Sequence, residues 1–229
     1  MNRSNVGALA SKTWLVGLVV MVMAQFTTQN AAGQRPGGRG EGLSAEKQQA
    51  AHELQARGVA HTLKLNDEAT SKIVVAYQKA RASHQKAQAA IRADESIERS
   101  DRRSKYQDLL EVERKKLDTE LQGFLKKEQA AQALASLGAF NRSWDRMVGT
   151  LSGFKLEKEK QFKALELLNG YVIETGKLAA AARASGDRQG VREATAEKKQ
   201  KLDAGLEKIL DATQLGKWKE ATAPRQRGR

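Results

Sequence analysis

Three serines each stand three residues before a lysine, and this S-x-x-K spacing could support nucleophilic catalysis. The pairs begin at Ser44, Ser83 and Ser152. In the serine acyl-transfer enzymes that use this spacing, S-D-N and K-T-G patterns complete the site. Neither pattern occurs here, and neither does G-x-S-x-G. Because a lysine-rich chain contains such spacings by composition alone, we expect no catalytic residue and no enzyme.

Histidine is the obvious candidate for metal binding, and the chain has His52, His61 and His84 but no cysteine. No two of these histidines are four residues apart, so no helix carries a paired ligand set. We therefore expect no cofactor and no histidine metal site, while a site built from carboxylates or assembled by the fold stays open. His84 falls in an apolar stripe and is interpreted as a packed residue at the edge of the core.

Two tryptophans stand between cations, an arrangement that could grip apolar and acidic segments of another protein. The two groups are Arg142, Trp144 and Arg146, and Lys217, Trp218 and Lys219. The alternative, which we favour, is that each tryptophan packs at the end of its helical unit while the charges are solvated, because large aromatic side chains most often serve core burial.

The first 33 residues have the order of a secretory signal peptide. Arg3 and Lys12 give a basic start, residues 15–26 are mostly apolar, and residues 31–33 (AAG) are small enough for cleavage. A membrane anchor is the alternative, but it needs about 20 apolar residues. We expect an exported protein, periplasmic or secreted, with residues 1–33 removed.

The net charge of +13 becomes +11 when the two basic residues of the leader are removed. An exported protein rarely meets nucleic acid, so we expect no nucleic-acid partner. Acidic protein segments or an anionic envelope surface of lipid or polysaccharide fit the charge better. A solvated, lysine-rich helical surface without a partner is the alternative. The absence of cysteine excludes disulfides and thiolate metal sites.

The body of the chain is predicted to be all-α. Only Pro36 and Pro224 occur, and the residues between them are mostly good helix formers. Residues 34–43 are rich in glycine and residues 223–229 are basic, so both are predicted to be tails.

The first helical unit is predicted over residues 44–148. Its first helix is expected to begin with Ser44 as N-cap and to stop at Gly58, and its second to begin near Asn66. One apolar stripe with helical spacing marks the second helix: Ile73, Tyr77, Ala80, His84, Ala87 and Ile91.

The pattern breaks over residues 92–100. A third helix is predicted to follow, and its apolar face consists of Tyr106, Leu110, Leu117, Leu121 and Phe124. A fourth is expected from about Lys127 to Met147, and residues 149–153 (GTLSG) look like a linker.

A second helical unit is predicted over residues 154–222. A helix is expected to start near Leu156, with Phe162, Leu165, Leu168, Val172 and Leu178 on its apolar face. A turn follows at residues 185–187 (SGD), then a long helix to Leu210 and a short one that ends near Ala221.

The two units resemble each other in sequence. Residues 116–129 (KLDTELQGFLKKEQ) and 201–214 (KLDAGLEKILDATQ) are identical at six of fourteen positions, with an offset of 85. Residues 63–65 (LKL) and 154–156 (FKL) match with an offset of 91, which predicts a connection six residues longer in the first unit. We interpret this as an internal duplication. The alternative is two amphipathic helices that match by composition.

Each long repeat ends in a helix-start motif. Asp211 can accept hydrogen bonds from exposed helix amides and Gln214 can reach back to the Asp211 amide, which together form a capping box. Leu210 stands before the cap and can pack on Leu215. The motif redirects the chain from one helix to the next.

A leucine, a cap, two free positions and a glutamine resemble the LTxxQ motif of the Spy/CpxP family of periplasmic proteins. Two stretches match the later copy of the motif, Leu125 to Gln129 and Leu210 to Gln214, the second with Asp211 as cap. Two weaker matches correspond to its earlier copy, Leu65 with Asn66 and the stretch that begins at Leu156. The copy at Leu65 lacks its glutamine, and Lys126 is a poor cap.

The resemblance implies a structural motif in a cradle-shaped, all-helical dimer, and a family of ATP-independent chaperones, envelope-stress regulators and metal sensors. Here the duplication suggests that one chain supplies both halves of an elongated bundle, as a monomer or a dimer. We therefore expect a chaperone-like protein that binds unfolded or envelope proteins. The alternative is an envelope-stress or metal-responsive sensor, or a structural helical protein with one specific partner.

Overall fold

The computed structural model describes residues 43–223, apart from the side chains of residues 183–185 and 188. This part of the chain forms eight α-helices and no strand, so the all-α prediction is confirmed. The helices are α1 (Ala45–Thr62), α2 (Asp67–Ala93), α3 (Arg102–Gln122), α4 (Lys127–Leu137), α5 (Arg142–Gly153), α6 (Lys158–Ser185), α7 (Arg188–Glu207) and α8 (Ala212–Thr222). The predicted leader and tails lie outside these residues, except for Leu43 and Ala223.

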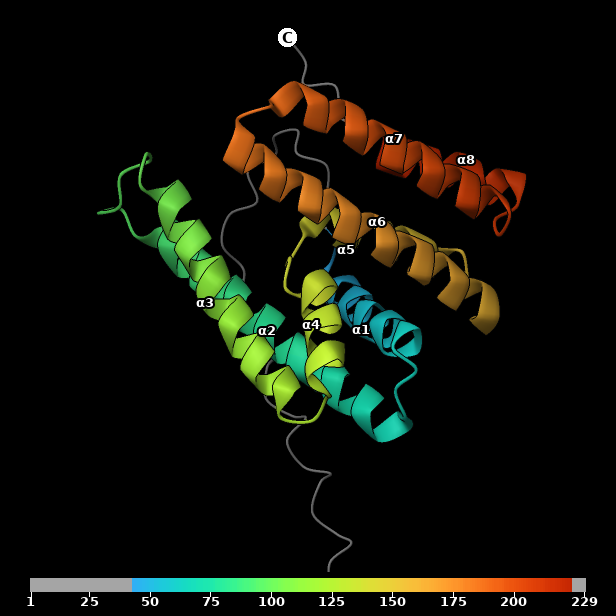
Figure 1. The fold of residues 1–229 in the computed structure, drawn as a ribbon, viewed down its shortest axis with the longest axis horizontal. Helices are drawn as coiled ribbons and strands as arrows, with labels where there is room; N and C mark the ends of the chain where they lie inside the picture. Colours follow the sequence, from blue (N-terminus) through green and yellow to red (C-terminus); the bar gives the residue numbers. More distant parts are fainter. Residues whose placement is uncertain (1–42, 224–229) are drawn as a thin grey trace, which may run out of the picture. The chain divides into compact units, whose positions relative to one another are not determined.

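Two long helical hairpins dominate the fold. Figure 1 shows α2 beside α3 and α6 beside α7, and each pair is joined by a short connection. Helices α1 and α5 contact each other, and α1 also contacts α6 of the second hairpin. The described helices belong to one compact unit. Of these helices, none is both long and apolar enough to span a bilayer.

The helices of the two hairpins correspond in order and length. Helices α2, α3 and α4 have 27, 21 and 11 residues, and α6, α7 and α8 have 28, 20 and 11. The first hairpin turns over residues 94–101 and the second over residues 186–187. This difference of six residues is the one that the two sequence offsets predict. The matching order, lengths and turns support the internal duplication.

The same backbone turn opens each hairpin. Lys64 has φ 52° and Lys155 has φ 50°, both in the left-handed region that non-glycine residues rarely adopt. Each follows the last turn of a helix, α1 or α5, and precedes the N-cap of the next helix, Asn66 or Glu157. Helix α5 is therefore the counterpart of α1.

The linker predicted at residues 149–153 is wrong, because these residues complete α5. Leu151 is buried, and a Cβ on Gly149 would lie 3.1 Å from the Leu43 side chain, so the segment is packed rather than free. The second repeat of helices thus begins at Arg142 instead of residue 154.

The expected stop at Gly58 is also wrong. Helix α1 continues to Thr62, and Gly58 is buried where a Cβ would lie 3.1 Å from the Leu165 Cβ. The glycine allows α6 to approach α1 closely and does not end the helix. Ser44 is confirmed as the N-cap, since its hydroxyl accepts a hydrogen bond from the Lys47 amide at 3.3 Å.

The fourth predicted helix, 127–147, is broken into α4 and α5. Helix α4 ends at Leu137, Phe140 has φ 43°, and the Asn141 side chain caps α5 by accepting from the Ser143 amide at 2.8 Å. The ring of Phe140 is buried and stacks on His84 at 4.9 Å between centroids. Packing of this ring stabilises a backbone conformation that the sequence pattern does not indicate.

The helix-start motifs have the predicted structure at one copy and half of it at the other. Asp211 accepts from the Gln214 amide at 2.8 Å, and Gln214 accepts from the Asp211 amide at 3.1 Å. At the first copy, Gln129 accepts from the Lys126 amide at 3.3 Å. A lysine side chain has no acceptor, so the reciprocal bond is not possible there.

Polar side chains from three helices meet inside the first half of the core. Asp145 of α5 accepts hydrogen bonds from Arg81 of α2 and, at 2.9 Å, from Gln55 of α1. Tyr77 donates to Gln55 at 2.7 Å. Burial alone would raise the pKa of Asp145, but the nearby His52 ring, the charge of Arg81 and the Gln55 amide hold that pKa below its ordinary value. Asp145 is therefore an ionised carboxylate in the core.

Candidate functional site

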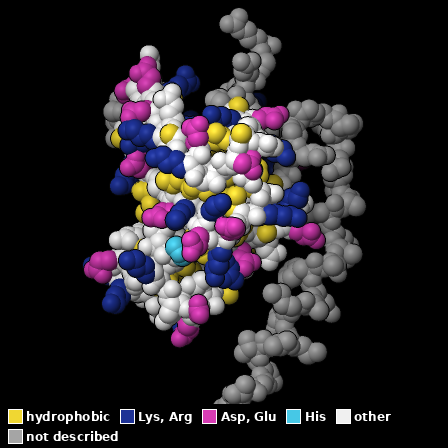
Figure 2. All heavy atoms as spheres, turned by 90° about the vertical axis from the view of Figure 1, so that its right-hand side faces the viewer, with side chains coloured by type: hydrophobic (Ala, Val, Ile, Leu, Met, Phe, Trp, Pro, Cys, Tyr) yellow, Lys and Arg dark blue, Asp and Glu magenta, His cyan; other side chains and the backbone are white. Residues whose placement is uncertain are grey.

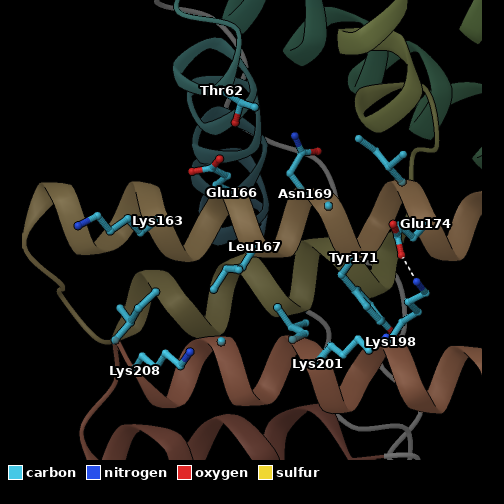
Figure 3. Close-up of a pocket in the computed structure, with 15 residues that line it drawn as sticks. Thr62, Lys163, Glu166, Leu167, Asn169, Tyr171, Glu174, Lys198, Lys201 and Lys208 are labelled. Atoms are coloured by element: carbon cyan, nitrogen blue, oxygen red, sulfur yellow. Dashed lines mark ion pairs between the residues drawn. The ribbon is translucent and has the colours of Figure 1, made fainter.

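A groove of about 810 Å³ runs between α6 and α7. Figure 3 shows Leu167 and Tyr171 pointing from α6 toward α7, with lysines along the edges. On the other side of α6, Thr62 of α1 lies near Glu166 and Asn169. The lining is predominantly apolar, and its largest apolar members are Leu167, Tyr171, Ile173, Leu202 and Ile209.

Two glycines open this groove, one in the interior of α6 and one in the last turn of α7. Gly170 of α6 and Gly205 of α7 both line it. A Cβ on Gly170 would meet no atom within 4 Å, and one on Gly205 would meet only the mobile end of the Leu167 side chain, at 2.9 Å. Glycine inside a helix costs about 1 kcal/mol relative to alanine. Internal packing around Gly170 gives no reason for this cost.

The first hairpin has side chains where the second has these glycines. The offset of 91 that aligns α2 with α6 places Lys79 at the position of Gly170. The offset of 85 that aligns α3 with α7 places Glu120 at the position of Gly205. Lys79 and Glu120 form an ion pair of 2.5 Å that bridges α2 and α3. The second hairpin thus lacks a bridge that the first hairpin has.

The charged residues near this position also differ between the two hairpins, and at these positions the second hairpin is the more basic. In α3 and its C-cap the positions are Glu113, Lys116, Glu120 and Gly123, and in α7 and its C-cap they are Lys198, Lys201, Gly205 and Lys208. Two acidic side chains have no counterpart in α7, and two further lysines are present. The groove therefore has a basic edge where the first hairpin has balanced charges.

Two of the edge lysines already have partners. Lys198 pairs with Glu174 across the hairpin, and Lys201 pairs with Glu197 at 2.7 Å. Lys163 and Lys208 form no ion pair with any residue of the described part of the chain. These two ammonium groups stand at the same end of the groove (Figure 3) and are available to an anionic partner.

Tyr171 and Asn169 add polar atoms to the apolar lining. Burial and the charge of Asp203 raise the pKa of Tyr171, so its hydroxyl stays neutral at physiological pH. Asn169 is buried, and its Oδ1 accepts no hydrogen bond from the described residues. Hydrogen-bonding capacity thus remains in a largely apolar groove.

Some hydrophobic side chains reach the surface of the described helices. Figure 2 shows hydrophobic side chains in a band across one face, bordered by Lys and Arg side chains with Asp and Glu among them. Among the large hydrophobic residues of the described range 43–223, those that are exposed are Val75, Val112 and Leu167. Leu167, at 37% exposure, is the one of these three that lies in the groove.

The two predicted tryptophan sites are not surface sites. Trp144 is 2% exposed and Trp218 is 0% exposed, so both rings pack in the core, as the favoured alternative holds. Trp218 donates to Asp203 at 2.7 Å. The flanking cations, Arg142, Arg146, Lys217 and Lys219, are exposed. The cations are at the surface without an aromatic surface beside them.

The motif residues serve the turns between helices. Leu125 and Leu210 are buried, and Leu65 and Leu156 are half-buried against the core. Gln214 donates to the Phe154 carbonyl at 3.4 Å, which ties the start of α8 to the end of α5. Asn66 accepts from the Ala69 amide at 2.8 Å. These residues stabilise the architecture, and none of them lines the groove.

The histidines are packed against aromatic rings. His84 is buried against Phe140, which confirms its predicted packing, and His61 stacks on Phe162 at 4.3 Å. His52 lies 3.7 Å from Asp145. Within residues 43–223, no three His, Asp or Glu side chains are grouped to hold a metal ion.

Comparisons with protein-family models, curated proteins and solved structures give no match for this chain. The candidate site consequently depends on the chain's own geometry. Sequence reasoning did not single out Gly170 and Gly205, although the alignment of the two repeats contains the signal. In that alignment each glycine of the second hairpin corresponds to a charged residue of the first.

Proposed function

We propose that this protein acts by reversible binding of polypeptide segments, as an exported, chaperone-like protein of the cell envelope. The observation that carries the proposal is the α6–α7 groove, whose apolar lining and basic edge suit an apolar, acidic segment. Binding by apolar contact and charge needs no nucleotide for release. The leader-like residues 1–33 support the proposed export.

The chemistry of the lining favours binding over reaction. Aliphatic and aromatic side chains form the walls, and the charged lining residues are four lysines and two glutamates, of which Glu174 is paired with Lys198. Recognition sites commonly combine such an apolar centre with a charged rim, because the centre supplies affinity and the rim supplies steering and specificity. A polypeptide with alternating apolar and acidic side chains can satisfy both parts at once.

A second candidate is an envelope protein with one specific partner, either a sensor or a structural component. Of the three exposed large hydrophobic residues in 43–223, Leu167 alone lies in the α6–α7 groove, and this favours the second candidate, because a general holdase benefits from larger exposed apolar patches. Val75 and Val112 are exposed singly on the first hairpin, away from the groove lining.

Suppression of aggregation distinguishes the two candidates. We expect the full chain to slow aggregation of several chemically unfolded, acidic proteins without ATP, and to do so less well as salt screens the lysines. Lysozyme, a basic client, is the matched control and should be protected less. Failure with every acidic client at low salt, at several-fold excess of this protein, would remove the chaperone proposal. Tight binding of one native partner without such suppression would establish the second candidate.

A further inference from the structure

We infer that the α6–α7 groove is a docking site for an acidic amphipathic helix of a partner polypeptide, admitted by Gly170 and Gly205. The inference rests on the proposed polypeptide-binding function and adds the class and conformation of the bound segment. It is based on the two glycines, the apolar walls and the lysines of the edge.

The length of the groove fits a short helix. Its lining on α6 extends from Lys163 to Glu174, and the facing lining extends along α7 from Lys198 to Gly205 and continues past the helix end to Ile209. Eleven residue steps along a helix span about 17 Å, or about three turns. A docked helix of three turns presents three or four apolar side chains on one face, and such a face matches the apolar row of the groove.

The glycines allow the backbone of the segment to come close. Small residues at a helix contact let helix axes approach, because no side chain stands between the backbones. Gly170 has open space beside it, and the side-chain end of Leu167 next to Gly205 can rotate away. In the first hairpin the Lys79–Glu120 pair occupies the equivalent place and would block such an approach.

The lysines select an acidic segment. Lys163 and Lys208 have no carboxylate partner among the described residues, and both stand at the groove's edge. The chain's predicted tails, 34–43 and 223–229, contain five arginines and one glutamate, so charge repulsion disfavours them as the occupant. A separate, acidic polypeptide is therefore the occupant that the charges favour.

The test transfers the ion pair of the first hairpin to the second. The probe is a fluorescent peptide of about 18 residues, long enough to populate a helix, with leucine and alanine on one face and glutamate on the other. Binding to the full chain is measured by anisotropy at low salt. The variant Gly170→Lys with Gly205→Glu should weaken binding about tenfold or more, as loss of a buried contact centre does. Charge-swapped closure, Gly170→Glu with Gly205→Lys, should weaken it similarly.

Matched controls separate closure of the groove from other effects. Gly176→Lys adds a lysine to the same helix, also in open space but outside the groove lining, and should leave the affinity unchanged. A peptide with lysines in place of its glutamates should bind at least tenfold more weakly. Should Gly205→Glu impair folding, Gly170→Lys alone, placed where nothing lies within 4 Å, tests the same closure.

Each outcome supports or overturns the inference. Loss of binding on closure, with Gly176→Lys unaffected, supports it. Equal affinity of the closed variants overturns the docking site while leaving polypeptide binding intact elsewhere on the chain. A third outcome is that the protein binds phosphatidylglycerol vesicles but not the peptide, and that the closed variants lose the vesicle binding. This outcome overturns the inference in favour of a lipid ligand. Failure to bind any peptide or unfolded client removes the proposed function as well.

Discussion

The two hairpins share a set of core leucines but differ in what covers them. Leu117 and Leu121 of α3 and their counterparts Leu202 and Leu206 of α7 are all buried. Above this shared core the first hairpin has the Lys79–Glu120 ion pair, whereas the equivalent positions of the second are two glycines in an apolar groove, and the pair that joins α6 and α7, Lys198–Glu174, lies at other positions. The repeat thus conserves its packing while one copy has an open surface.

The interiors of the two hairpins also differ. Tyr77 and Arg81 of α2 belong to the polar network around Asp145, whereas the equivalent residues of α6, Leu168 and Val172, are apolar. Buried ions need fixed partners, and so the first hairpin is tied to α1 and α5 at defined positions. At these two positions the second hairpin is held by apolar contacts, which tolerate small adjustments around a bound segment. We interpret the first half as the anchor and the second half as the binding element.

The largest expected effect tests the anchor. Asp145→Ala leaves the buried Arg81 guanidinium without its carboxylate, and removing one partner of a buried pair costs about 3–5 kcal/mol. Urea unfolding followed by far-ultraviolet circular dichroism should show this loss. Peptide binding by protein that remains folded should be unchanged, because Asp145 does not line the groove. A loss below about 1 kcal/mol, as for an exposed pair, would contradict the anchoring role.

Acid should remove the same stabilisation. The pKa of Asp145 is lowered in the folded state, so its contribution is present above the ordinary value of 3.8 and is lost as pH falls through the folded value. The free energy of unfolding should therefore drop below about pH 4 in the wild type. Leu168→Ala, in the apolar interior of the second hairpin, should lower stability at every pH by a constant amount. Asp145→Asn should flatten the acid limb, and an unchanged limb would exclude Asp145 as its source.

Local signals in the sequence predict the hairpins well. The stripe from Ile73 to His84 and the caps at Ser44, Asn66 and Asp211 depend on neighbours within a few residues, and the structure has them as predicted. The two offsets between the repeats give the six-residue difference in length between the hairpin turns. Helix periodicity and capping are local properties, and therefore they can be predicted from the sequence alone.

The errors have a different origin. Gly58 and Gly149 look like breakers, but each allows another part of the chain to pack against its helix. The kink at Phe140 depends on a ring that stacks against α2, and the partners of Asp145 are 64 and 90 residues away. Tertiary contacts of this kind override local propensity. The groove depends on which faces of α6 and α7 meet, which is a tertiary property, although aligning the two repeats in sequence already singles out its two glycines.

An effect of intermediate size is expected when the first hairpin is given the glycines of the second. Lys79→Gly with Glu120→Gly removes the bridge of the first hairpin and puts two glycines into helix interiors. The helix propensities and the exposed ion pair together predict a loss of about 2 kcal/mol. Thermal unfolding measures this loss, and the Gly170→Lys, Gly205→Glu variant should change stability in the opposite direction. If both variants are destabilised, the two positions are not structurally equivalent.

The smallest expected effects concern the two helix-start motifs, whose cap residues are Lys126 and Asp211. Asp211→Ala removes the acceptor for the Gln214 amide and should cost about 1 kcal/mol. Lys126→Asp supplies the missing acceptor at the equivalent position, where the Gln129 side chain already accepts from the backbone amide of residue 126. The variant should be more stable than the wild type by a similar amount. Urea unfolding of both variants measures effects that should be close in size and opposite in sign. A Lys126→Asp variant that gains nothing would show that the first copy is held in its turn by the burial of Leu125, whatever residue occupies the cap.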